Sequence, residues 1–216
     1  MVARSVLPLV ALCAMACADV LGIDDARMDP ALNAATSLES GSDAADGPAP
    51  TLCEEYCETV IRACSDNESD SFDVYDSPFT CERQCLLLTP GAERDQSGNT
   101  VHCRLFHARV AELSRGERLT ECPAAGPGGD GVCGANCEGY CTLMLATCSG
   151  LFETLDACRA SCALVPDVGG YDISQTSGDS LQCRLYHLGA ALVSPEHHCP
   201  HAAGAYPCAG ARGADN

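Results

Sequence analysis

Four of the six histidines in this chain fall within fifteen residues, at His187, His197, His198 and His201. Imidazole nitrogen is a preferred ligand of Zn(II) and Cu(II). If a helix and the loop after it bring His187 beside His198 and His201, these three side chains could bind one ion, with His197 as an alternate ligand. The competing interpretation is structural: His107 and His187, each one turn after a cysteine, would be partly buried and would bond a loop carbonyl. Apart from a Zn or Cu ion at this cluster, no cofactor is expected.

The chain contains 18 cysteines, and sixteen of them form two series of eight in the same order. The residues between them also agree: Cys-Glu-Glu-Tyr-Cys at 53–57 matches Cys-Glu-Gly-Tyr-Cys at 137–141. An even number of cysteines at repeated spacing indicates a disulfide framework. No Cys-x-x-Cys pair, the usual sign of a zinc module, occurs. The sixteen are Cys53, Cys57, Cys64, Cys81, Cys85, Cys103, Cys122 and Cys133, followed by Cys137, Cys141, Cys148, Cys158, Cys162, Cys183, Cys199 and Cys208.

The repeat divides the chain into a first module, residues 53–134, and a second module, residues 137–208. In each module the first three cysteines recur at i, i+4 and i+11, which keeps them on one face of a helix. The fold class that follows is small, all-α and disulfide-rich, with two tandem three-helix modules and four disulfides in each. Low aromatic content, without any Trp, indicates that the disulfides compensate for a small core.

The remaining helices are placed by their boundary residues. The second helices are expected at about 78–88 and 155–164, with Ser77 as a cap before Pro78. The third helices are expected to open at Asn99 and Asp179. The last two cysteines of each module then fall in a Gly/Pro-rich loop.

Two disulfide pairings remain open. A hairpin folded near Leu151 favours Cys141–Cys162, Cys148–Cys158 and Cys137–Cys183, with local loop bridges Cys122–Cys133 and Cys199–Cys208. The nested alternative joins Cys141 to Cys158 and Cys137 to Cys162. That alternative resembles the twin Cys-x3-Cys helical hairpins of small mitochondrial intermembrane-space chaperones.

The N-terminus has the features of an export signal. Residues 1–16 hold one arginine and an apolar stretch too short to span a membrane. They end before Cys17, which is expected to carry a lipid, although ordinary cleavage and release of a soluble protein is the alternative. Residues 17–51 are predicted to form a flexible acidic tether rich in Ala, Ser and Pro, and residues 209–216 a disordered tail. Export would place the cysteines in an oxidising compartment.

Three segments together resemble a family of cysteine-rich lipoproteins of Gram-negative soil bacteria. They are Cys-Arg-Leu-Tyr-His at 183–187, His-Cys-Pro-His-Ala at 198–202, and Cys-Ala-Asp-Val-Leu-Gly-Ile-Asp-Asp at 17–25. The first module departs from this pattern, with Glu-Cys-Pro-Ala at 121–124. The family has no assigned activity, so the resemblance implies export and tandem modules.

The other chemical patterns are weak. A net charge of −18 makes nucleic acid a poor partner. The acidic stretch Asp66–Asp70 lacks the glycine and the glutamate of a calcium loop, and is better explained as a solvated insertion. Gly126, Gly128 and Gly131 match a dinucleotide motif in letters only. No catalytic residue is identified, and the chain is not expected to be an enzyme.

These observations favour an exported, lipid-anchored, non-enzymatic interaction module of the cell envelope. Its expected partners are the membrane, through the N-terminal lipid, and an envelope or extracellular protein. The expected location is the outer membrane, the periplasm or the extracellular space. One alternative is a Zn- or Cu-binding protein that uses the second module, and another is a secreted inhibitor or toxin-like factor.

Overall fold

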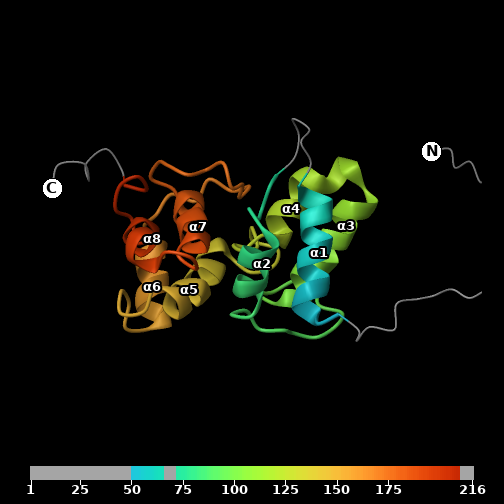
Figure 1. Ribbon diagram of the computed structural model, residues 1–216, viewed down its shortest axis with the longest axis horizontal. Helices are drawn as coiled ribbons and strands as arrows, with labels where there is room; N and C mark the ends of the chain where they lie inside the picture. The colour runs from blue at the N-terminus through green and yellow to red at the C-terminus, as the bar shows by residue number, and fades with distance from the viewer. Residues whose placement is uncertain (1–49, 66–71, 210–216) are drawn as a thin grey trace, which may run out of the picture. The chain divides into compact units, whose positions relative to one another are not determined.

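The computed structural model describes residues 50–65 and 72–209, and within these ranges it is all-helical (Figure 1). The described residues contain no strand, only an isolated bridge between Thr89 and Thr100. The small all-α, disulfide-rich class is therefore confirmed. The helices of the first module are α1 (Leu52–Cys64), α2 (Pro78–Cys85), α3 (Val101–Leu113), the 3-10 turn η2 (Arg115–Glu117) and α4 (Arg118–Ala125); those of the second are α5 (Asn136–Thr147), α6 (Leu155–Cys162), α7 (Leu181–Ala190) and α8 (Pro195–Ala202).

Some predicted segments lie outside the described residues. These are the signal segment 1–16, lipidated Cys17, almost all of the tether and of the tail, and the acidic stretch Asp66–Asp70. Thr51, predicted as the end of the tether, instead caps α1, where its backbone and side chain exchange hydrogen bonds with Glu54. Among the described helices, none is long and apolar enough to cross a membrane.

Side-chain caps explain where the helices begin. Ser77 accepts a hydrogen bond from the Thr80 amide at 3.2 Å, and Pro78 follows as the first helical residue, as expected. The predicted caps Asn99 and Asp179 are wrong by one residue. The next residues, Thr100 and Ser180, cap α3 and α7 through their hydroxyl groups.

Each module has a fourth helix that the sequence analysis placed in a loop. The helices α4 and α8 contain Pro123 and Pro200 in their interiors, and prolines at such positions argue against a helix. Both helices are only eight residues long, and each proline removes one backbone N–H donor from its helix. Cys122 and Cys199 therefore lie on helices, whereas Cys133 and Cys208 lie in loops.

The disulfides follow one connectivity in both modules, and it is the nested one. By their order within each module, α1 and α5 are helix 1, α2 and α6 are helix 2, α3 and α7 are helix 3, and α4 and α8 are helix 4. Helix 1 and helix 2 are joined by Cys53–Cys85 and Cys57–Cys81 in the first module, and by Cys137–Cys162 and Cys141–Cys158 in the second. The favoured pairing Cys141–Cys162, Cys148–Cys158 and Cys137–Cys183 is wrong because Cys141–Cys162 would centre the hairpin between residues 151 and 152, about two residues after the centre of both nested bridges, which lies between residues 149 and 150. Gly150, with φ +89°, lies at that turn. The nested cysteines are then equidistant from the turn and lie opposite each other.

The remaining disulfides join segments that are distant in sequence. The local bridges Cys122–Cys133 and Cys199–Cys208 are wrong, since the structure has Cys64–Cys122 and Cys148–Cys199. Because Cys122 and Cys199 lie on helices, they face the end of helix 1 and not the following loop. The loop cysteines pair with helix 3, in Cys103–Cys133 and Cys183–Cys208. Every bridge in the described residues stays within its own module.

The repeated tyrosine of the two Cys-x-x-Tyr-Cys segments anchors the fourth helix. Tyr56 and Tyr140 are buried, and their hydroxyl groups donate to the carbonyls of Ala125 (2.6 Å) and Ala202 (2.9 Å). These alanines occupy equivalent places in the repeat, three residues after Cys122 and Cys199. A buried phenol needs such an acceptor, so this contact and the adjacent disulfide together fix helix 4 against helix 1.

Hydrogen bonds also join the two modules. The Asp73 amide donates to the Asp172 carboxylate at 2.9 Å, and the Ile173 amide donates to the Asp73 carbonyl at 2.8 Å. Gly139 on α5 approaches the first module closely, because a Cβ there would lie 2.5 Å from the Pro127 carbonyl oxygen. The described residues of both modules belong to one compact unit.

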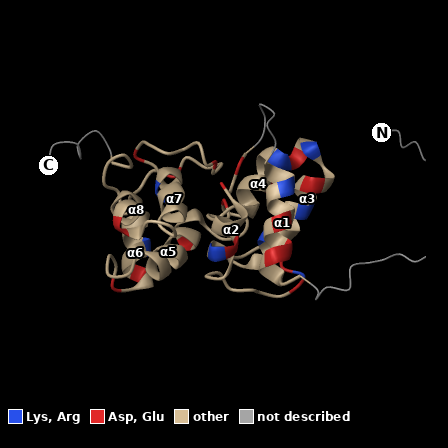
Figure 2. Ribbon diagram, viewed as in Figure 1, with Lys and Arg blue, Asp and Glu red and all other residues tan. Residues whose placement is uncertain are grey.

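Charged residues are denser along α1 and α3 than along α7 and α8 (Figure 2). Arg62 pairs with Glu112 at 2.5 Å, and Arg109 pairs with Glu55, so two ion pairs link α1 to α3. These pairs are half exposed, and such pairs contribute little to stability. The helices of the first module are therefore held mainly by disulfides and buried side chains.

Removing a long-range bridge should cost more than removing a short one. The double substitution Cys64→Ala/Cys122→Ala opens a loop of 58 residues, and Cys141→Ala/Cys158→Ala opens one of 17. We expect both to lower the free energy of unfolding by about 2–5 kcal/mol, with the larger loss for the first, because the longer loop restricts the unfolded chain more. Denaturant unfolding of the full chain measures this. A smaller loss for the 58-residue loop would contradict it.

Candidate histidine metal site

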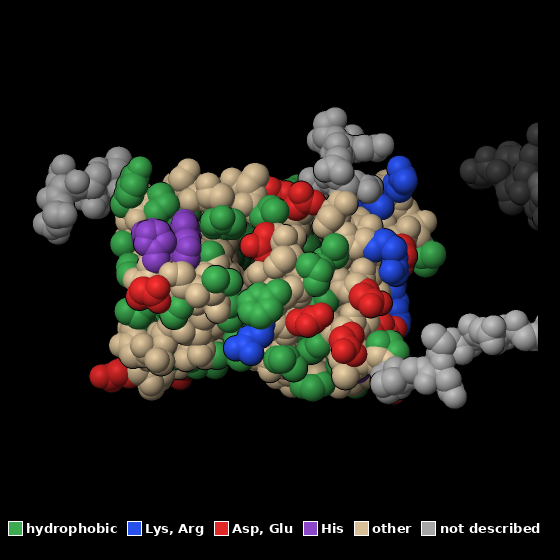
Figure 3. Space-filling view, in the orientation of Figure 1, with side chains coloured by type: hydrophobic (Ala, Val, Ile, Leu, Met, Phe, Trp, Pro, Cys, Tyr) green, Lys and Arg blue, Asp and Glu red, His purple; other side chains and the backbone are tan. Residues whose placement is uncertain are grey.

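The four clustered histidines meet between two helices of the second module. His187 lies on α7, one turn after Cys183, while His197, His198 and His201 lie on α8 around Cys199. Figure 3 shows imidazole side chains gathered in one surface patch over α7 and α8. The structure thus brings together all four residues predicted as metal ligands.

The ring of His187 is fixed by a backbone carbonyl. Its Nε2 lies 3.1 Å from the Thr176 carbonyl oxygen, which can only accept, so Nε2 carries the proton. In the neutral ring Nδ1 is then unprotonated, and it accepts a hydrogen bond from Nδ1 of His198 at 2.9 Å. A carbonyl that fixes the tautomer of a histidine in this way is typical of metal-binding histidines.

His201 completes a set of three nitrogens. One ligand nitrogen from each of His187, His198 and His201 lies within 4.8 Å of the others. Nδ1 of His201 is buried and has no hydrogen-bond partner in the described part of the chain. Buried polar atoms without partners are rare in native proteins, and this one belongs to the cluster.

His197 borders the cluster from the solvent side. It is exposed, whereas His187 is buried and His198 and His201 are half-buried. Its ring centroid lies 4.7 Å from that of His198 and 4.9 Å from that of His201. It does not belong to the set of three close nitrogens, and its role as an alternate ligand stays a prediction.

The surroundings favour the neutral form of the imidazoles. Burial lowers the pKa of His187, an effect partly opposed by the hydrogen bond to Thr176 and reinforced by the other histidines. Burial also lowers the pKa of His198 and of His201, and the neighbouring histidines lower both further. Neutral rings are the form that binds a metal ion.

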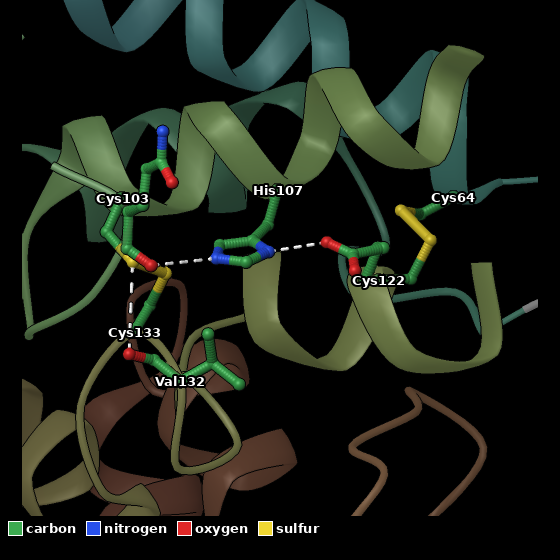
Figure 4. Close-up of polar contacts among 8 residues, drawn as sticks. Cys64, Cys103, His107, Cys122, Val132 and Cys133 are labelled. Atoms are coloured by element: carbon green, nitrogen blue, oxygen red, sulfur yellow. Dashed lines mark hydrogen bonds and ion pairs between the residues drawn. A yellow bond between two sulfur atoms is a disulfide. The ribbon is translucent and has the colours of Figure 1, made fainter. Parts of the chain in front are cut away.

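The first module has the same disulfide connectivity as the second but lacks the histidine cluster. His107 occupies the place of His187, and its Nε2 likewise donates to a loop carbonyl, that of Gln96, at 3.1 Å (Figure 4). Its Nδ1, however, lies 2.5 Å from a carboxylate oxygen of Glu121. Glu121 and Ala124 stand where the second module has His198 and His201. The structural interpretation of His107 and His187 is therefore confirmed for their Nε2 atoms, and the modules differ only at Nδ1.

Glu121 is a residue that the sequence reasoning did not assign. The signal was present, since Glu-Cys-Pro-Ala and His-Cys-Pro-His align, but a carboxylate facing His107 could not be inferred while Cys122 was placed in a loop. Two other groups also combine ligand atoms, Cys103/His107/Cys133 and Cys183/His187/Cys208. Their sulfurs are bridged, so they offer no thiolate.

The geometry fits a divalent ion. A tetrahedral Zn(II) with ligand distances of about 2.0–2.1 Å separates its nitrogens by about 3.3 Å. The Nδ1 atoms of His187 and His198 lie 2.9 Å apart, and the three ligand nitrogens lie within 4.8 Å of one another, so these distances bracket that separation.

No known family model matches the chain, and neither the curated proteins nor the solved structures give a match.

Glu121→Ala tests the structural pairing in the first module. We expect a loss of about 1–3 kcal/mol in the free energy of unfolding, because Nδ1 of the buried His107 would lose its partner. Glu117→Ala, which removes an exposed carboxylate with no capping bond, is the matched control. Equal stability of the two variants in denaturant unfolding would refute the pairing.

Proposed function

We propose that this chain is an exported metal-binding protein whose second module binds one Zn(II) or Cu(II) ion through His187, His198 and His201. One observation carries the proposal: the buried Nδ1 of His201 has no hydrogen-bond partner in the described part of the chain, and His201 shares a cluster of close ring nitrogens with His187 and His198, whose Nδ1 atoms lie 2.9 Å apart. In the first module the corresponding Nδ1 has a carboxylate partner. A bound cation would satisfy the three nitrogens of the second module.

The ligand set indicates the class of ion. Every cysteine in the described residues is in a disulfide, so soft ions such as Cu(I) find no thiolate. Imidazole suits Zn(II) and Cu(II), and nitrogen sites bind Cu(II) more tightly. Mg(II) and Ca(II) require oxygen ligands and are not expected to bind at this cluster.

Export and lipid anchoring at Cys17 belong to the same proposal. The apolar signal segment, the small residue before Cys17 and eight disulfides that require an oxidising compartment support them. A non-enzymatic interaction role at the envelope and a secreted inhibitor remain predictions. Metal binding is compatible with either.

The decisive measurement is isothermal titration of the full-length oxidised protein with Zn(II) and Cu(II). We expect one ion per chain. The variant His198→Glu/His201→Ala copies the first module, gives His187 a carboxylate partner and should reduce affinity about 100-fold or more. His102→Ala, which removes a histidine outside the cluster, should bind like the wild type. Undiminished metal binding by the double variant would contradict the proposal and favour a structural role for the histidine cluster.

Proton competition should weaken binding at low pH. The three ligands have pKa values below 6.5, the ordinary value, so they are neutral at pH 7 and affinity is full there. Affinity should fall as the pH drops below about 6.5 and through the lowered pKa values, because each proton then competes with the ion. Zn(II) titrations between pH 7.5 and 5 measure this, and an affinity that is constant over the range would contradict it.

A further inference from the structure

Disulfides hold both site helices in place. Cys183 lies on α7, one turn before His187, and is bridged to Cys208 in the loop after α8. Cys199, between His198 and His201 on α8, is bridged to Cys148 at the end of α5. Tyr140 also donates to the Ala202 carbonyl next to His201. The backbone that carries the ligands is therefore fixed without any ion.

The first module is an internal control for this point. It has the same four bridges and the same tyrosine contact, yet it has Glu121 and Ala124 in place of two ligands. The frame therefore forms where no histidine cluster exists. In small domains that need zinc to fold, the energy of metal binding is folding energy. Here the frame is covalent, so an ion can enter and leave a folded protein.

His197 lies where the ion would meet solvent. Three nitrogens from His187, His198 and His201 leave a fourth tetrahedral position open. His197 is exposed, and its ring centroid lies within 5 Å of those of His198 and His201. Its side chain makes no hydrogen bond within the described residues. A rotation of this free side chain can place a nitrogen at the fourth position.

We infer that the site carries an exchangeable ion, with His197 as the solvent-side fourth ligand that an acceptor displaces. This inference rests on the proposed function. The acceptor is a molecule with nitrogen or carboxylate donors. In the exchange, the bond from the metal to His197 breaks as a bond to the incoming donor forms. His197 leaves as neutral imidazole, and neither the charge nor the oxidation state of the ion changes.

His197→Ala in the full-length protein tests the inference, with His102→Ala as the matched control. Stopped-flow absorbance follows Zn(II) transfer from the loaded protein to an excess of a chromophoric chelator. Wild-type transfer should accelerate with chelator concentration. In His197→Ala, one ion should still bind, with Kd about tenfold higher and transfer about tenfold faster, because water replaces the fourth imidazole. Cu(II) electron paramagnetic resonance should count one nitrogen fewer. Far-UV circular dichroism should not change when the ion is removed.

The outcomes separate the two proposals. One-ion binding with unchanged Kd and transfer rate in His197→Ala would overturn the exchange role and leave metal binding intact. Loss of helical signal on chelation would also overturn it, since the ion would then be structural. If the wild type binds neither Zn(II) nor Cu(II), the proposed function fails, and the inference fails with it.

Discussion

The nested disulfides between the first two helices of each module are the constraint on which the rest of the structure depends. They join cysteines equidistant from the hairpin turn, as in Cys137–Cys162 and Cys141–Cys158, so they fix the register of the two helices. Once the register is set, the last cysteine of helix 1, Cys64 or Cys148, is available to form a disulfide with helix 4. With few aromatic side chains, a module of this size has a core of marginal stability, and the disulfides supply the additional stability.

The same frame supports two different chemistries at one position. In the first module Nδ1 of the buried His107 pairs with Glu121 and its Nε2 donates to the Gln96 carbonyl, so both ring nitrogens are satisfied. In the second, histidines replace the carboxylate and the nearby alanine, and the charge partner is lost. The frame tolerates the exchange because Cys122 and Cys199, which position these residues, are bridged to helix 1 in both modules. Function can therefore diverge here at little structural cost.

A covalent frame also changes what a bound ion would do. Structural zinc sites usually organise the chain that binds them, whereas α7 and α8 are already held by Cys183–Cys208 and Cys148–Cys199. Binding energy at the histidine cluster is then available for affinity. The lowered pKa values of His187, His198 and His201 have the same effect, because few protons must leave before an ion binds.

The sequence by itself determined the helical class, the repeated cysteine frame and the participation of sixteen cysteines in disulfides, because spacing along a helix and repetition along the chain are local properties. Only the tertiary structure decided the pairing of the cysteines. A shift of about two residues in the α5–α6 turn changes which sulfurs face each other, and spacing alone does not fix that turn. The tertiary structure also revealed α4 and α8. Their interior prolines, Pro123 and Pro200, argued against a helix in the sequence, but a disulfide and a tyrosine hydrogen bond stabilise each of these short helices. The partners of the histidine nitrogens, Thr176, Gln96 and Glu121, come from other segments of the chain, and only folding brings them together.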